Sequence, residues 1–170
     1  MYKVDIYLAQ STASLSKDER WHGYVVACIK NGEEKTVNGF GHIFGTYHEA
    51  TLRSLSDALD RLNQSCEVHI HTEDRFVLNM LGTQLEKWAG NNYLNAKGEP
   101  IKHAELWEEV YVRTRGQLIV AEEGRHSYSE WLDTEMKRRE RLIHDTEMKR
   151  RERLIHDTAS CGIEMAKEDK

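Results

Sequence analysis

The sequence predicts an α/β fold, in which a mixed five-stranded sheet is flanked by helices and followed by an extended C-terminal helix. Two observations predict it. Three β-rich segments come first, separated by polar connections, which favours antiparallel pairing of neighbours. Helical and strand-like segments then alternate from residue 47 onward, as they do in βα units with parallel strands. We therefore expect the order β-β-β-α-β-α-α-β-α.

The three N-terminal strands are predicted from alternation and composition. Residues 4–8 (VDIYL) alternate and are rich in β-forming side chains, as a first strand should be. Residues 23–29 (GYVVACI) are almost continuously apolar, which indicates a strand buried on both faces. Asn31-Gly32 then favours a tight hairpin turn into a third strand over residues 34–40.

The later elements follow from a change in the period of the apolar residues. From residue 47, apolar side chains recur at helical spacing and predict an amphipathic helix. The remaining segments are a strand at 67–71 (EVHIH), short helical stretches at 76–88, a polar loop at 91–100, a helix at 103–112, a strand at 117–121 and a helix from about residue 128. Strands that alternate with helices are expected to extend the sheet with parallel neighbours.

Composition narrows the class of protein. A chain of 170 residues, 39% of them apolar, is long enough for one compact domain with a proper core. Its net charge of -5 makes it no obvious binder of polyanions. Its three cysteines are not closely spaced, which favours reduced thiols in a cytosolic protein over disulfides or a zinc site. The sequence shows neither a signal-peptide pattern nor a membrane span, so we expect a cytoplasmic protein.

Residues 51–62, 66–80, 88–107 and 124–133 form four stretches that together resemble the type 1 ribonuclease H family. The most specific, WAGNNYLNAKGEPIKHAELW (88–107), is similar to the family's aromatic-and-basic handle and the Lys-Gly-x-Pro-Val-Lys-Asn-x-x-Leu-Trp run that follows it. TLRSLSDALDRL (51–62) matches the family helix that starts with a catalytic Glu-Leu, and CEVHIHTEDRFVLNM (66–80) matches the strand that ends in Thr-Asp. GRHSYSEWLD (124–133) resembles the stretch with a mobile histidine and the last aspartate. The resemblance implies a ribonuclease H-like domain over residues 1–132.

This resemblance implies a metal-dependent nuclease site with some ligands missing. The family places four carboxylates around two Mg²⁺ (or Mn²⁺) ions to hydrolyse the RNA strand of an RNA/DNA hybrid. Two of these positions correspond to Ala9 and Thr51, which carry no carboxylate. Glu73 and Asp133 match the other two and are the candidate catalytic residues and metal ligands. His126 matches the histidine that helps the product leave, and the two missing carboxylates predict weak or lost hydrolysis.

The resemblance also implies contacts to an RNA/DNA hybrid or a duplex nucleic acid. Such proteins read the shallow minor groove of an A-form-like helix through 2′-hydroxyl and phosphate contacts. The candidate binding residues lie in the loop before the first helix and in the handle: Thr46, Tyr47, His48, Trp88, Tyr93, Lys97 and Lys102. Because glycine and asparagine occupy handle positions that are often basic, we expect modest, salt-sensitive affinity.

Several of these residues have structural interpretations as well. Trp88 and Trp107 lie at helical positions and could be core residues. Residues 73–74 could cap the following helix. His69 and His71 alternate on a strand, and one exposed and one hydrogen-bonded histidine is a better interpretation than a metal-binding pair.

The C-terminal segment, residues 133–170, contains a perfect tandem repeat. DTEMKRRERLIH occupies 133–144 and again 145–156, and each copy is a good helix former. A 12-residue repeat rotates a helix by about 120° beyond three full turns, so the apolar residues of the two copies do not share one face. We expect one copy to pack on the domain. The duplication leaves open whether Asp133, Asp145 or Asp157 takes the site position.

Three functions remain open at this point. The first is a ribonuclease H-like protein that binds hybrid or duplex nucleic acid, with weak or lost magnesium-dependent hydrolysis. The second is an active ribonuclease H with a rebuilt metal site, against which Ala9 and Thr51 argue. The third is a scaffold that forms a homo-oligomer through the long C-terminal helix.

Overall fold

The computed structural model describes the backbone of residues 1–168 and the side chains of residues 1–160. The chain divides into two compact units, Met1–Met136 and Lys137–Lys170. Cys28 and Cys66 are free thiols, and the side chain of Cys161 lies outside the described residues. Among the helices of the described part, none is long and apolar enough to cross a membrane.

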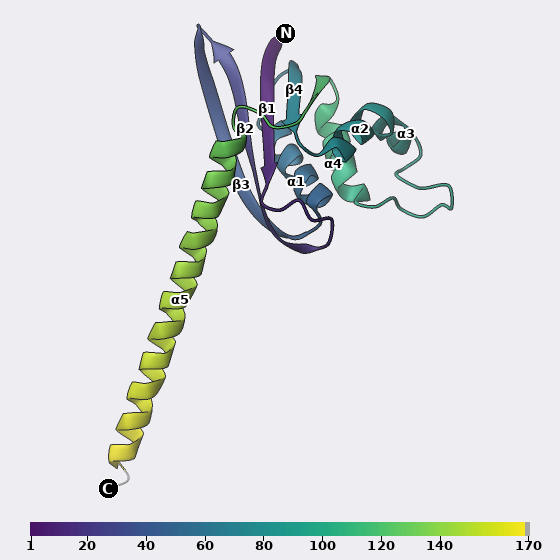
Figure 1. Cartoon of the computed structure of the whole chain (residues 1–170). Helices are drawn as coiled ribbons and strands as arrows, with labels where there is room; N and C mark the ends of the chain where they lie inside the picture. Colours follow the sequence, from purple (N-terminus) through teal and green to yellow (C-terminus); the bar gives the residue numbers. More distant parts are fainter. Residues whose placement is uncertain (169–170) are drawn as a thin grey trace. The chain divides into compact units, whose positions relative to one another are not determined.

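The first unit contains one mixed sheet of five strands. They are β1 (Tyr2–Gln10), β2 (Asp18–Lys30), β3 (Glu33–Gly45), β4 (Cys66–Thr72) and β5 (Leu118–Glu123), in the spatial order β3-β2-β1-β4-β5 (Figure 1). β1 pairs antiparallel with β2, and β2 with β3. β4 lies parallel to both β1 and β5. The predicted three antiparallel strands followed by βα units are confirmed.

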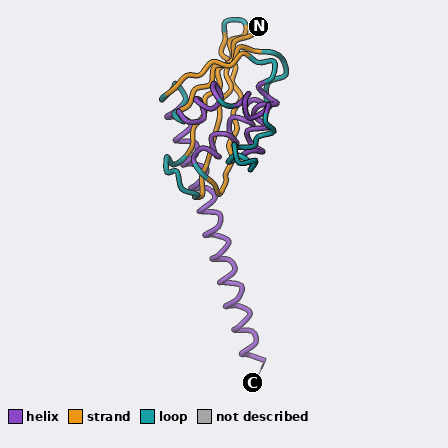
Figure 2. The backbone as a smooth tube through the Cα atoms, turned by 90° about the vertical axis from the view of Figure 1, so that its right-hand side faces the viewer, coloured by secondary structure: helices purple, strands orange, loops and turns teal. Residues whose placement is uncertain are grey.

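The helices differ from the predicted order in one respect: three helices, not two, separate β4 from β5, because residues 75–90 form two short helices. The helices of the chain are α1 (Tyr47–Leu59), α2 (Arg75–Thr83), α3 (Leu85–Gly90), α4 (Ala104–Thr114) and α5 (Ser129–Glu168), drawn in purple in Figure 2. The strands β1 to β3 are longer than the apolar runs that predicted them. Antiparallel backbone pairing continues along the hairpin whatever the polarity of the side chains, so apolar content alone underestimates strand length.

Local chemistry explains where these elements turn and begin. Asn31 and Gly32 both have positive φ, 54° and 77°, as a two-residue hairpin turn of this kind requires. Thr46 caps α1, because its hydroxyl accepts a hydrogen bond from the backbone N–H of Glu49. The Glu49 side chain in turn accepts from the backbone N–H of Thr46 and completes a capping box.

The two faces of the sheet bury different sets of residues. Side chains alternate along β1, so Val4, Ile6 and Leu8 lie in the main core, which includes Leu52 of α1 and Trp107 of α4. The intervening side chains point to the opposite face of the sheet. There a second apolar cluster forms around Val25, Leu132 and Met136, of which the last two come from the first turns of α5. Strand β2, which lies between β3 and β1, is buried from residue 22 to residue 27, as its apolar run predicts.

The second unit is helical from Lys137 to Glu168. Within its described side chains, which end at residue 160, the large apolar ones are exposed: Leu142, Ile143, Met148, Leu154 and Ile155. Residues of opposite charge follow one another at intervals of four along this helix, and such pairs stabilise isolated helices by about 0.2–0.5 kcal/mol each. The helix propensity of its residues and these charge pairs therefore explain why this segment is helical although its large apolar side chains are exposed.

Candidate functional site

The C-terminal end of β1 is apolar. Ala9 lies on the sheet face that carries the second cluster and packs against Val25, Leu132 and Met136. It pairs with Gly23 of β2. This is the position at which the resemblance expects a metal-binding aspartate. Its side chain supplies a methyl group to an apolar cluster and no oxygen to a metal.

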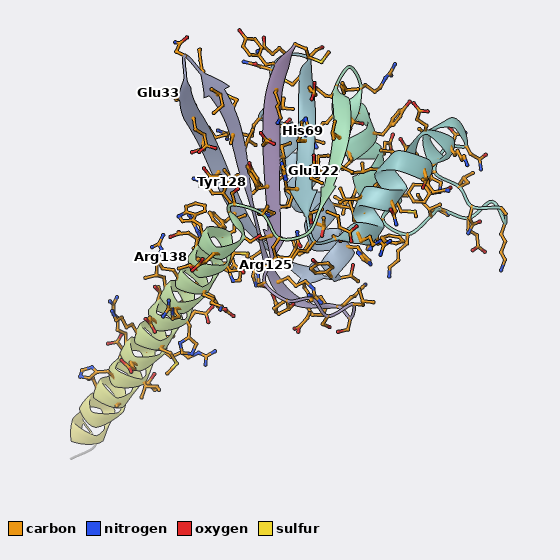
Figure 3. All side chains as sticks on the ribbon, turned by 45° about the horizontal axis from the view of Figure 1, so that its top comes forward. Glu33, His69, Glu122, Arg125, Tyr128 and Arg138 are labelled. Carbon is orange, nitrogen blue, oxygen red and sulfur yellow. The ribbon has the colours of Figure 1, made fainter. Side chains whose placement is uncertain are left out.

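Glu73 and Asp133, the two acidic candidates, are brought together by one cation. Arg125 lies in the segment between β5 and α5 (Figure 3). Its Nη1 lies 4.0 Å from Glu73 Oε2, and its Nη2 lies 3.6 Å from Asp133 Oδ2. All three side chains are substantially exposed, at 60% for Arg125, 52% for Glu73 and 40% for Asp133. The sequence did not single out Arg125. A lone arginine in a loop gives no signal that two distant carboxylates will meet it.

Backbone and ring contacts fix the segment that carries Arg125. On one side, the backbone N–H of Gly124 donates to Thr72 O at 3.0 Å, and Gly124 has a φ of 111° that a residue with a Cβ rarely adopts. On the other side, His126 Nε2 donates to Leu8 O at 2.8 Å. The segment is thus attached to the C-terminal ends of both β4 and β1.

His126 is held by both ring nitrogens. Nε2 donates to Leu8 O, and Nδ1 accepts from the backbone N–H of Tyr128 at 3.2 Å. Burial lowers the pKa of His126, which keeps the ring neutral and fits this tautomer. The ring also lies 5.1 Å from the ring of Tyr7, centroid to centroid. His126 therefore lies beside the candidate carboxylates, but its hydrogen bonds connect it to the protein backbone.

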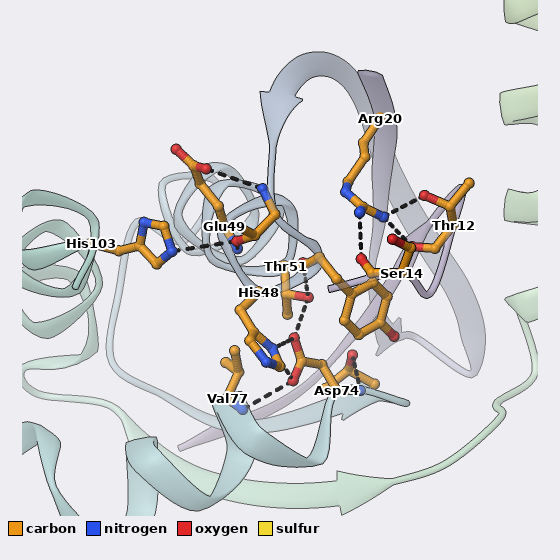
Figure 4. A network of polar contacts seen from close by, with 12 residues as sticks. Thr12, Ser14, Arg20, His48, Glu49, Thr51, Asp74, Val77 and His103 are labelled. Carbon is orange, nitrogen blue, oxygen red and sulfur yellow. Dashed lines mark hydrogen bonds and ion pairs between the residues drawn. The ribbon is translucent and has the colours of Figure 1, made fainter. Parts of the chain in front are cut away.

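Thr51, the remaining position of the four at which the resemblance expects a carboxylate, belongs to a buried hydrogen-bond network that is drawn in Figure 4. Its hydroxyl donates to Asp74 Oδ2 at 2.7 Å, and the Thr51 side chain is fully buried. Asp74 is 1% exposed and accepts from the backbone N–H of Val77 at 3.1 Å, which makes it the N-cap of α2. His48 Nδ1 lies 2.9 and 2.8 Å from the two oxygens of the same carboxylate.

Asp74 is the residue whose role the sequence reveals only in part. The capping interpretation of residues 73–74 is confirmed for Asp74, and an acidic side chain directly before an apolar helix was the signal. Its contacts to His48 and Thr51 come from α1, more than 20 residues earlier in the chain. Local sequence carries no information about that pairing.

These donors do not fit a site for two magnesium ions. Such a site needs several carboxylate oxygens facing one cavity. Ala9 has none, and the Thr51 hydroxyl is buried and donates to Asp74. Glu73 and Asp133 both face Arg125. Within the part of the chain that the structure describes, no group of three or more His, Cys, Asp or Glu is arranged to hold a metal ion.

Three of the predicted nucleic-acid contacts line one pocket. A cavity of about 240 Å³ lies between α1, α2, α3 and the start of α4. It is lined by His48, Leu52, Phe76, Trp88, Ile101, Lys102, His103 and Trp107. His48, Trp88 and Lys102 are thus brought together, although they are far apart in the sequence. Aromatic walls beside a lysine and two histidines suit contact with a polyanion that carries stacked rings.

The other predicted contacts lie around this pocket in different settings. Thr46 is almost fully buried as the cap of α1, and its Oγ1 lies 3.4 Å from His103 Nε2. Tyr47 is partly buried, and burial raises the pKa of its hydroxyl to about 12. Tyr93 is partly buried against the core, and Lys97 is exposed in the loop before α4. Neither of these last two residues lines the pocket.

Trp107 and the two histidines of β4 have structural roles. Trp107 is 2% exposed and meets Trp88 edge-on at 5.2 Å between ring centroids, so its core role is confirmed. His71 pairs with Asp5 at 2.8 Å. His69 lies near Glu122 (Figure 3), and the carboxylates of Glu67 and Glu122 contact its two ring nitrogens at 2.7 and 3.3 Å, respectively. The expectation of one exposed histidine is wrong, because carboxylates on neighbouring positions hold both rings.

Several curated proteins that are similar in sequence to this chain are named Ribonuclease H. No protein-family model matches the chain. A Ribonuclease H of Xanthomonas oryzae pv. oryzae is 30% identical over 97 residues, which cover 57% of this chain and 64% of that protein. A Ribonuclease H of Helicobacter pylori is 28% identical over 99 residues, covering 58% and 65%. The chain thus spans slightly less than two thirds of the length of these curated relatives.

Solved structures of ribonuclease H domains have a similar fold. The structure described as LC9-RNase H1, a type 1 RNase H with the type 2 active-site motif, has a TM-score of 0.66 at 17% identity, covering 78% of this chain and 69% of that chain. A foamy viral protease-reverse transcriptase in complex with RNA/DNA hybrid has a TM-score of 0.60 at 24% identity, covering 72% and 17%. The chain therefore has a ribonuclease H-like fold and is similar in sequence to proteins named Ribonuclease H.

Proposed function

We propose that this chain binds RNA/DNA hybrid or duplex nucleic acid and that its magnesium-dependent hydrolysis of RNA is weak or lost. The observation that carries the proposal is the set of four positions where the family places carboxylates. Two of them, Ala9 and Thr51, have no acid, and the other two, Glu73 and Asp133, share the guanidinium of Arg125. A divalent ion would have to displace that cation and would find two carboxylates where the family uses four.

Binding is supported by features that do not depend on the carboxylates. His48, Trp88 and Lys102 converge on one pocket, and Lys97 extends from the neighbouring loop. One structural neighbour is described in complex with an RNA/DNA hybrid. The first unit has more acidic than basic residues, so few counterions are released on binding. The affinity is therefore modest and falls as the salt concentration rises.

An active ribonuclease H with a rebuilt site is the second candidate. The curated relatives named Ribonuclease H favour it, and a structural neighbour described as having a different active-site motif indicates that the motif varies on this fold. In this alternative Glu73 and Asp133 are the metal ligands and Mg²⁺ or Mn²⁺ is the cofactor.

Cleavage and binding of one labelled RNA/DNA hybrid separate the two candidates. We expect the natural chain to bind the hybrid and to give no cleavage above background with Mg²⁺ or Mn²⁺. The Ribonuclease H of Helicobacter pylori, as a positive control, should cleave the same substrate. Cleavage by the natural chain that disappears in Glu73→Gln would establish the active enzyme instead. Failure of the natural chain to bind hybrid at low salt would contradict the proposed function itself.

A further inference from the structure

We propose that Arg125 is a built-in cation that contacts a backbone phosphate of the bound nucleic acid, so that binding needs no divalent metal. This inference rests on the proposed function and deepens it. The residues present do not fit a site for two metal ions. The place between Glu73 and Asp133, where a metal ion is expected from the resemblance, has a guanidinium within 4.0 Å of each carboxylate.

The fold holds Arg125 at this place through its two neighbours. The backbone N–H of Gly124 donates a hydrogen bond to the carbonyl oxygen of Thr72 at the end of β4. The ring of His126 donates one to the carbonyl oxygen of Leu8 near the end of β1. The residue between them is therefore confined to the edge of the sheet where both parallel strands end. An arginine on a free loop would have many other positions available to it. Here the backbone on both sides is fixed before any ligand binds.

The guanidinium is available to a ligand although it has two partners. Its distances to the carboxylate oxygens, 3.6 and 4.0 Å, exceed the 2.7–2.9 Å typical of charge-assisted hydrogen bonds. A guanidinium has five N–H donors in a planar fork, which suits the paired oxygens of a phosphate. The Arg125 side chain is 60% exposed, so a phosphodiester can reach it from solvent.

Electrostatics gives this cation a clear effect on binding. Two carboxylates at the edge of a nucleic-acid surface repel the backbone phosphates, and Arg125 neutralises one of their two charges. Arg75, another cation of this region, pairs with Glu123 at 3.8 Å. Removing Arg125 leaves Glu73 and Asp133 with no cation between them. Removing the charge of Glu73 has the opposite effect, because it lowers the repulsion and frees the guanidinium.

The test is the affinity of the whole 170-residue chain for a labelled RNA/DNA hybrid, measured by fluorescence anisotropy over a range of salt concentrations. Each titration is made with EDTA and again with Mg²⁺. The variants are Arg125→Ala, Arg125→Lys and Glu73→Gln. Arg115→Ala is the matched control, because Arg115 is an exposed arginine that follows α4 and has no salt bridge among the described residues. Circular dichroism checks that every variant is folded.

The expected outcome is a natural chain that binds equally well with EDTA and with Mg²⁺. Arg125→Ala should weaken binding about five- to tenfold and lower the slope of log affinity against log salt by about 0.9, which is the share of one phosphate contact. Arg125→Lys should retain part of the affinity, Arg115→Ala should change nothing, and Glu73→Gln should bind more tightly in EDTA.

Two results would overturn the inference while leaving the proposed function intact. One is binding by the natural chain that requires Mg²⁺. The other is an Arg125→Ala variant with unchanged affinity and salt slope. If the natural chain binds no hybrid in either buffer, the proposed function fails and this inference fails with it.

Discussion

The hydroxyl of Thr51 donates a hydrogen bond to the buried carboxylate of Asp74 at 2.7 Å. This contact lies at the position where the resemblance expects a catalytic glutamate. Asp74 also caps α2 and holds His48, so one carboxylate joins the start of α1 to the start of α2. The substitution at Thr51 therefore comes with a local structure that has no room for a second acid.

Replacing Thr51 with glutamate should destabilise the protein. A second carboxylate beside Asp74 would be buried next to a like charge, and we expect a loss of about 3 kcal/mol or more in the free energy of unfolding. Urea denaturation measures it. Asp74→Ser, which retains a capping side chain, should recover much of the loss when combined with Thr51→Glu. A Thr51→Glu protein as stable as the natural one would mean that Asp74 does not occupy this place.

Replacing Ala9 with aspartate should also lower stability, for a different reason. Ala9 packs in the apolar cluster around Val25 and Leu132, so a charge there loses hydration without gaining a partner. Because Ala9 is only partly buried, we expect a smaller loss of about 1–2 kcal/mol. Ala9→Ser is the control and should lose less. Equal stability of Ala9→Asp and the natural chain in thermal denaturation would contradict this packing. Any attempt to restore activity at Ala9 and Thr51 must include both measurements.

His22 should make the protein less stable in mild acid. Burial lowers its pKa from 6.5 to about 4, so between these values the unfolded chain binds more protons than the folded chain. Stability therefore falls as the pH drops below about 6.5, and the loss from this group is complete near pH 4, at about 3 kcal/mol. His103 and His126, whose pKa values burial also lowers, act in the same direction.

Urea denaturation at a series of pH values checks the contribution of His22. The variant His22→Phe has no titrating ring, and its stability should depend less steeply on pH between 6.5 and 4. His69 has the opposite effect on the pH dependence of stability, because its hydrogen bond to Glu67 raises its pKa. Its stabilising effect is present in acid and is lost as the pH rises through its folded pKa. An identical pH profile for His22→Phe and the natural chain would rule out His22 as the source.

Lys102 should contribute to nucleic-acid binding through charge alone. It lines the pocket beside His48 and Trp88 and is exposed. We expect Lys102→Ala to weaken hybrid binding about three- to fivefold and to lower the salt slope by about 0.9, with no change in thermal stability. Lys30→Ala, at the distant end of β2, is the control. Unchanged binding by Lys102→Ala would remove this pocket from the interface.

The sequence by itself determined the five strands, their order along the chain and the position of the first helix. Alternation along residues 4–8, the apolar run at 23–29 and the Asn31-Gly32 turn predicted the antiparallel strands, and the change to helical spacing predicted α1. It also revealed that Ala9 and Thr51 lack carboxylates. All of these are local features. The period of a pattern, a turn residue or a missing oxygen can be read from a few consecutive positions.

Only the tertiary structure decided which side chains meet. Glu73, Arg125 and Asp133 come from three segments, and their contact depends on the parallel pairing of β4 with β1 and β5. The same holds for Asp74, which reaches back to His48 and Thr51 on α1. Strand order and register set these distances, and they result from the burial of the whole sheet. No short stretch of sequence contains that information, so the arginine between the two carboxylates became visible only in the folded chain.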